Sequence, residues 1–328
     1  MIESAQLALS NLLAPAVLFF LLGFGAGWFK SDLNVPEGAA KTLALVLMLS
    51  IGFKGGVEAS KAGLSADFVS AAAAGVALSF LLPVVGFFVL RAISKLDRAT
   101  AAATAAHYGS VSIVTFVAGT EFLRVAGVPF GGHMVAVVAL METPAILSAL
   151  VLAGAGAGAG AAGRQGLQGD LIREVALNGT VVVLIGSFLI GAITGTAGMS
   201  KLDVFVGPVF QGVLVLFLLD MGLVAARRLR SARSLTPALV GFAIAMPLFS
   251  CTMALLLSFA LGLAPGDAAV LAILSASASY IAVPAAMRIA LPAADPGVYL
   301  TLSLAITFPF NLVVGIPLYT AVASRLIG

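Results

Sequence analysis

Charged residues and cysteine are both scarce in this sequence. Asp, Glu, Lys and Arg make up 9% of its 328 residues and hydrophobic residues 61%, a balance that no water-soluble domain of this length needs. Cys251 is the single cysteine, which excludes an intramolecular disulfide and argues against a cysteine-based metal site. The sequence holds only two histidines and neither an HExxH nor a GxSxG motif, so we do not expect an enzyme.

Two further absences concern targeting and partners. The first residues include Glu3 but no Lys or Arg, so the basic region of a cleavable signal peptide is missing. The basic residues fall in short loops instead of along one face, which argues against a nucleic-acid partner.

Long apolar runs are abundant and extend along the whole chain. Each is about 20 residues long, enough to cross a hydrocarbon layer of about 30 Å. We therefore predict an all-α polytopic membrane protein with ten transmembrane helices, at residues 11–29, 38–57, 67–91, 98–124, 133–154, 173–195, 203–225, 235–262, 267–290 and 296–323.

The distribution of Lys and Arg predicts the orientation. If the N-terminus lies outside, most of the 17 basic residues fall on the cytoplasmic side, among them the cluster at 227–233. Because cytoplasmic loops carry the excess of Lys and Arg, we expect both termini outside and the central loop in the cytoplasm of a bacterial inner (plasma) membrane.

Internal similarity indicates an inverted repeat of five spans plus five. Residues 43–52 resemble 213–222, and 140–144 resemble 305–309. Because five is odd, the second half enters the membrane in the opposite sense. We expect repeats at 1–154 and 173–328, joined by a Gly/Ala-rich cytoplasmic linker at 155–172; a small-residue helix face packed against a neighbour is the alternative for that linker.

Two polar stretches interrupt the fourth and ninth spans, at residues 106–116 and 275–284. Matching interruptions in two halves of a membrane chain point to a transporter binding site. We expect two discontinuous helices whose free N–H groups face a small anion; the alternative is serines that bond back to carbonyls and serve packing. The predicted anion ligands are Tyr108, Gly109, Ser110, Val111, Ser112, Ser277, Ala278, Ser279 and Tyr280.

A second group of oxygen-bearing residues predicts a sodium ion. Pro144 and Pro309 each free a backbone carbonyl in the fifth and tenth spans, and an intramembrane carboxylate is by default a functional candidate. The predicted sodium ligands are Glu142, Thr143, Thr307 and Asn311. The alternative for Glu142 is a structural pair with His107 or a buried hydroxyl.

Four strings together resemble the sodium-dependent bicarbonate transporters of the SbtA type: Tyr108 to Ser112, Met141 to Ile146, Ala278 to Ala286, and Thr307 to Asn311. The resemblance implies a 5+5 inverted-repeat fold, a core domain that moves against a gate domain, a homotrimer, and bicarbonate import coupled to sodium. It also implies that the serine-rich interruptions hold the anion.

The resemblance sets the expected function and its alternatives. We expect a secondary active transporter that couples sodium to uptake of bicarbonate or a similar small monovalent anion by alternating access. A small carboxylate as substrate, a passive channel and an intramembrane enzyme are the alternatives. The short Gly/Ala central loop departs from the longer, more polar loop expected of cyanobacterial members, which leaves a PII-like regulatory partner open.

Overall fold

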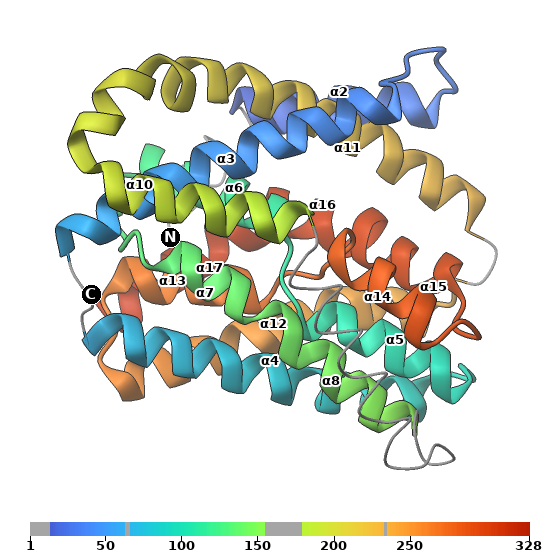
Figure 1. Cartoon of the computed structure of the whole chain (residues 1–328). Coiled ribbons are helices and arrows are strands. Elements are labelled where there is room, and N and C mark those ends of the chain that lie inside the picture. Colours follow the sequence, from blue (N-terminus) through green and yellow to red (C-terminus); the bar gives the residue numbers. More distant parts are fainter. Residues whose placement is uncertain (1–13, 63–65, 155–178, 233–234) are drawn as a thin grey trace.

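The computed structural model describes residues 14–62, 66–154, 179–232 and 235–328, and every regular element in these ranges is a helix (Figure 1). The prediction of an all-α protein is confirmed. The α-helices are α2 (Pro15–Trp28), α3 (Glu37–Ala62), α4 (Ala66–Ile93), α5 (Arg98–Gly109), α6 (Ile113–Val125), α7 (Met134–Leu140), α8 (Glu142–Ala153), α10 (Gly179–Val204), α11 (Phe210–Ser231), α12 (Pro237–Leu261), α13 (Pro265–Ser275), α14 (Ala282–Ala290), α15 (Pro296–Leu300), α16 (Phe308–Phe310) and α17 (Ile316–Leu326). Three π-helical segments join some of them: η1 (Phe205–Val209), η2 (Thr301–Thr307) and η3 (Asn311–Gly315).

Seven helical segments of the described ranges are long and apolar enough to cross a membrane. Two shorter apolar helices, α2 and α13, accompany them. The chain is therefore a membrane protein by the length and composition of its helices. The predicted linker at 155–172 and the start of the sixth predicted span lie outside the described residues.

One stretch differs from the sequence prediction. The gap at 196–202 between the sixth and seventh predicted spans is helical: α10 is interrupted at Gly195, where the sixth span was predicted to end, and helical structure then runs through η1 into α11. The chain turns at Gly195, whose φ of 56° lies where glycine is favoured. Pro208 lies inside η1 and has no N–H to donate, which is consistent with the wider π-helical hydrogen bonding there.

The helices form two layers, which lie one above the other in Figure 1. The four-helix layer consists of α2, α3, α10 and α11, in which α10 packs on α3 and α11 packs on α2. Glycines permit these close approaches: a Cβ on Gly52 would lie 2.1 Å from Ser187 Oγ, and one on Gly222 would lie 2.1 Å from the carbonyl oxygen of Phe20. The remaining helices form the larger layer.

Two hydrogen bonds tie the two halves of the chain together inside the larger layer. The N–H of Gly131, just before α7, donates to Asp267 Oδ1 at the start of α13, at 2.6 Å. The N–H of Asp295, just before α15, donates to Thr100 Oγ1 at the start of α5, at 3.0 Å. Each bond therefore joins the beginning of a helix in one half to the beginning of a helix in the other.

Candidate functional site

Two irregular segments meet in the middle of the larger layer. Helix α5 ends at Gly109 and α6 begins at Ile113, with extended backbone at Ser110 and Ser112. Helix α13 ends at Ser275 and α14 begins at Ala282. Both irregular segments fall inside the polar stretches 106–116 and 275–284 that the sequence singled out.

The two segments hydrogen-bond to each other. The N–H of Ser279 donates to the carbonyl oxygen of His107 at 2.8 Å, and the N–H of Ser112 donates to Ser277 Oγ at 2.8 Å. The Ser277 hydroxyl donates in turn to the carbonyl oxygen of Leu274 at 2.7 Å. Backbone groups released where the helices stop are thus satisfied by protein atoms, as an apolar surrounding requires.

Serine side chains also accept hydrogen bonds from N–H groups at the start of the two helices that follow, α6 and α14. Ser112 Oγ accepts from the N–H of Thr115 at 3.2 Å and caps α6. Ser279 Oγ accepts from the N–H of Val283 at 3.4 Å near the start of α14. Because the first N–H groups of a helix lack intrahelical acceptors and carry partial positive charge, the amino ends of α6 and α14 favour an anion between them.

A small cavity lies where these amino ends meet. Its volume is about 10 Å³, roughly the space that one water needs. It is lined by Val111, Ser112, Ile113, Glu142, Ser279, Tyr280 and Ile281.

Glu142 brings the only acidic side chain to this lining. It begins α8, is 2% exposed, and neither of its carboxylate oxygens has a hydrogen-bond partner among the described residues. A buried carboxylate without a partner is costly unless a cation or a proton neutralises it. The sequence alternative of a structural pair with His107 is not seen: His107 Nδ1 lies 2.6 Å from the carbonyl oxygen of Ala103, and its ring stacks on Tyr299.

The predicted anion ligands divide into two sets. Val111, Ser112, Ser279 and Tyr280 line the cavity, whereas Tyr108, Gly109, Ser110, Ser277 and Ala278 do not. Ser277 instead supports the backbone of Ser112, and Ser110 Oγ is buried with no hydrogen-bond partner in the described ranges. A Cβ on Gly109 would lie 2.1 Å from Pro83 Cγ, so this glycine permits close packing against α4.

The predicted sodium ligands are likewise not in one place. Only Glu142 lines the small cavity. Thr307 Oγ1 donates to the carbonyl oxygen of Ala243 at 2.7 Å and lies 2.8 Å from the Tyr108 hydroxyl. Nothing is described of the Thr143 side chain, and the described residues hold no group of three or more His, Cys, Asp or Glu side chains that could bind a metal.

Asn311 supports the second irregular segment, a role that the sequence did not reveal. Its Nδ2 donates to the carbonyl oxygen of Ala276 at 2.7 Å, and its Oδ1 accepts from the Tyr319 hydroxyl at 2.8 Å. Ala276 follows the last residue of α13, so Asn311 stabilises the place where that helix stops. The sequence also missed Ile113 and Ile281 as cavity residues, because nothing distinguishes them from other apolar residues.

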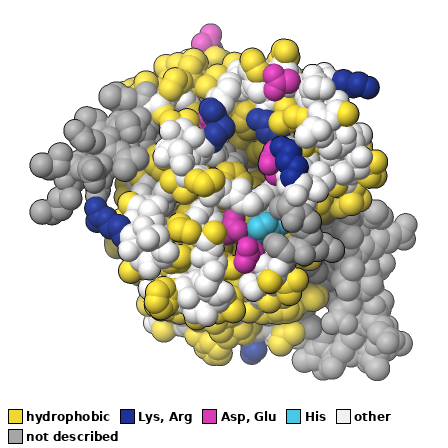
Figure 2. Space-filling model, turned by 90° about the vertical axis from the view of Figure 1, so that its left-hand side faces the viewer, with side chains coloured by type: hydrophobic (Ala, Val, Ile, Leu, Met, Phe, Trp, Pro, Cys, Tyr) yellow, Lys and Arg dark blue, Asp and Glu magenta, His cyan; other side chains and the backbone are white. Residues whose placement is uncertain are grey.

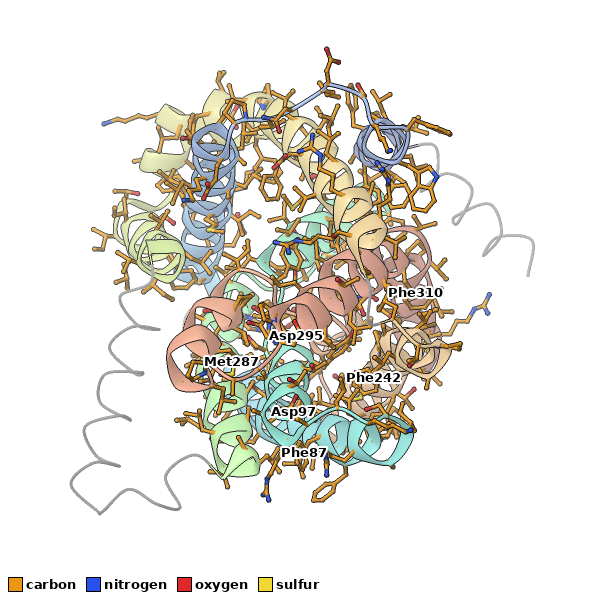
Figure 3. The ribbon with its side chains drawn as sticks, turned by 90° about the vertical axis from the view of Figure 1, so that its right-hand side faces the viewer. Phe87, Asp97, Phe242, Met287, Asp295 and Phe310 are labelled. Carbon is orange, nitrogen blue, oxygen red and sulfur yellow. The ribbon has the colours of Figure 1, made fainter. Side chains whose placement is uncertain are left out.

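A much larger cavity of about 640 Å³ lies between the two layers. It reaches from Lys41 and Arg228, near the start of α3 and the end of α11, to Tyr280 and Ile281. These helix ends lie at the side of the molecule shown in Figure 3, where Asp97 and Asp295 are labelled. Tyr280 and Ile281 line both cavities and therefore separate the small one from the large one.

A protein-family model described as the Na⁺-dependent bicarbonate transporter superfamily matches residues 15–324. The chain belongs to this superfamily. A comparison with curated proteins gave no match. The resemblance read from the sequence is thus confirmed, and the Na⁺-dependent bicarbonate transporter superfamily supports sodium and bicarbonate as the transported species and a transporter instead of an enzyme.

Proposed function

We propose that this protein is a secondary active transporter that takes up bicarbonate, or a similar small monovalent anion, together with sodium by alternating access. The observation that carries the proposal is the small cavity in which the amino ends of α6 and α14 meet the carboxylate of Glu142. The N–H groups at these helix starts can bind an anion, and the unpaired carboxylate of Glu142 can bind a cation in the same cavity.

The inverted repeat is part of this proposal. In it, α5 with α6, and α13 with α14, are the corresponding discontinuous spans of two halves with opposite orientation. The bonds to Asp267 and Thr100 support the correspondence, because they are counterparts: Asp267 and Thr100 both accept at the start of the first helix of a discontinuous span, each from an N–H of the opposite half. The glycines at positions 52 and 222 support it too, since each lets a helix of one half pack on a helix of the other. In this proposal the larger layer is the core domain and the four-helix layer the gate domain.

Glu142 provides a physical reason for coupling to sodium. An anion bound beside an ionised carboxylate is repelled by about 4 kcal/mol at 4 Å and an effective dielectric constant of about 20. A sodium ion between the two charges replaces this repulsion by attraction on both sides. Sodium therefore binds first, or together with the anion. One sodium per monovalent anion also makes entry electroneutral, which avoids a cost of about 2.3 kcal/mol for each charge moved against 100 mV.

The large cavity supports an access route from the cytoplasm. With both termini outside, Lys41 and Arg228 belong to the cytoplasmic side, and the cavity that they line leads to Tyr280. Movement of Tyr280 and Ile281 would join it to the small cavity. Because about 10 Å³ holds little more than one water, the two irregular segments must also separate to admit an anion.

Uptake by proteoliposomes tests the proposed function. Purified protein should accumulate labelled bicarbonate when an inward sodium gradient is imposed, and much less with potassium in place of sodium. Uptake indifferent to sodium would refute the coupling. Competition by formate, acetate and nitrate separates bicarbonate from the alternative of a small carboxylate substrate, and saturation of the rate separates a carrier from a channel. The homotrimer stays a prediction of the resemblance, and a PII-like regulatory partner stays open.

A further inference from the structure

A second cavity between the layers lies at the opposite end of the molecule from the large one. It has a volume of about 190 Å³ and extends along α3 from Ile51 to Glu58 and along α6 from Phe116 to Arg124. Phe116 lies about one helical turn after Ile113, which lines the small central cavity. This outer cavity therefore ends close to the proposed anion site.

Two basic and two acidic side chains line the outer cavity, and one of the basic ones forms no ion pair with any described residue. Arg124 forms two hydrogen bonds to the Glu121 carboxylate, at 3.0 and 2.6 Å, and Glu58 pairs with Lys61 at 2.7 Å. Within the described ranges Lys54 Nζ has no carboxylate within 4.0 Å; it lies over the Phe210 ring, 5.1 Å from the centroid. Figure 2, which faces this end, shows basic and acidic side chains side by side. Glu121 and Asp203 attract the Lys54 ammonium over longer distances, but no ion pair among the described residues holds it, and it lies beside open space.

The cavity is also closed against the small central one in this conformation. Gln211 of α11 donates to Glu121 Oε1 of α6 at 2.8 Å, which ties the four-helix layer to the larger layer. Phe116 is 1% exposed and fills the space between the cavity and the start of α6. A solute in the outer cavity therefore cannot pass inward until the layers move.

We propose that the outer cavity is a waiting site for the transported anion, and that Lys54 is the cation that attracts it. The inference rests on the proposed function for its direction, since it places this cavity on the outer side of the route. An ammonium that no ion pair holds, beside open space, is available to bind an anion directly. A small monovalent oxyanion fits its size and charge, and the ammonium of Lys54 provides three N–H donors for it.

Transport in vesicles of known orientation tests this role. In right-side-out membrane vesicles, Lys54→Gln should raise the KM for bicarbonate about tenfold at low ionic strength and leave the maximal rate unchanged. In inside-out vesicles its KM should equal that of the unaltered protein. Lys54→Arg should restore the low KM, because it keeps the charge. Lys201→Gln is the matched control: it removes an exposed positive charge from the same side, outside the cavity.

Direct binding separates this proposal from the proposed function. The protein has six lysines, and reductive ¹³C-methylation, which preserves their charge, makes each visible by NMR in detergent. Bicarbonate should shift the Lys54 signal, assigned with Lys54→Arg, and leave the Lys201 signal in place. An unmoved Lys54 signal, or a KM raised equally from both sides, would overturn the waiting site even if uptake is driven by sodium. A shifted Lys54 signal without sodium-dependent uptake would leave the site standing and refute the proposed function.

Discussion

The backbone N–H of Ser279 donates to the carbonyl oxygen of His107 at 2.8 Å, across 172 residues of chain. A second bond has its donor in the other segment: the N–H of Ser112 donates to Ser277 Oγ. Each irregular segment therefore satisfies backbone groups that the other leaves free. A change in one segment must be felt by the other, which is what a site shared by two halves of a transporter needs.

Ser277→Ala should destabilise the protein by about 1–3 kcal/mol, because it leaves the buried N–H of Ser112 without an acceptor. It should also weaken transport, since the first irregular segment loses its support. Thermal unfolding in detergent and sodium-driven uptake measure the two effects. Ser275→Ala is the matched control: the Ser275 hydroxyl is buried nearby but has no hydrogen-bond partner among the described residues. Equal stability of the two variants would mean that the Ser277 bond contributes nothing.

Glu142→Gln should raise the sodium concentration needed for half-maximal uptake by roughly tenfold or more. The amide keeps the shape of the side chain, but it removes the charge that attracts the cation; a loss of about 1.4 kcal/mol corresponds to a factor of ten. A sodium titration of bicarbonate uptake measures the change. Glu37→Gln, at an exposed glutamate that lines the large cavity, serves as control. A sodium titration that Glu142→Gln leaves unaltered would exclude Glu142 as a sodium ligand.

Tyr280→Ala should permit a leak, because Tyr280 is one of only two residues lining both the small and the large cavity. We expect faster sodium entry without bicarbonate, and a lower ratio of bicarbonate to sodium transported. Tyr280→Phe keeps the ring and should stay coupled if the ring alone forms the barrier. Parallel fluxes of labelled sodium and bicarbonate decide between these outcomes; tight coupling in Tyr280→Ala would show that Ile281 suffices.

Gly222→Ala should destabilise the protein by about 1–3 kcal/mol, because the added methyl group would meet the Phe20 carbonyl oxygen at 2.1 Å and push α11 away from α2. Gly212→Ala lies on the same helix with open space around it. It should be neutral, or stabilising by up to about 1 kcal/mol through higher helix propensity. The unfolding midpoints of the two variants in detergent test whether close glycine contacts hold the four-helix layer together.

Asp97 predicts a dependence of stability on pH. Its partial burial raises the pKa of the carboxyl group, but hydrogen bonds from the side chain and the N–H of Thr100 help to outweigh this effect, so the pKa lies below its ordinary value. The ionised cap on α5 therefore stabilises the folded protein above the ordinary pKa of aspartate, and this contribution is lost as the pH falls through the lowered value. Asp97→Asn should weaken that acid dependence of the unfolding midpoint, since asparagine still caps the helix.

The sequence predicted features that depend on neighbouring residues in the chain. It did not predict which residues, distant in the chain, lie together in the fold. Apolar runs predict membrane helices because a helix that crosses lipid must be apolar. The residues around Ser112 and Ser279 were among those that showed the resemblance to the family. Nothing in the chain order could place Glu142 beside Ser279 and away from Thr307, because that depends on how α8 packs. The sequence also could not show that Gly109 permits close packing against Pro83. A glycine in a polar stretch looks the same whether it contacts a ligand or packs against a helix.

The turn at Gly195 and the helical connection of α10 to α11 have a consequence for how the layers are connected. The four-helix layer consists of two consecutive pairs, α2 with α3 and α10 with α11; α3 packs on α10 and α2 on α11, and the turn at Gly195 stays inside the layer. Among the described helices, consecutive ones lie in different layers at three places: α3 and α4, α8 and α10, and α11 and α12. A displacement of one layer past the other must therefore be accommodated at these three places, whereas each layer can move as a unit.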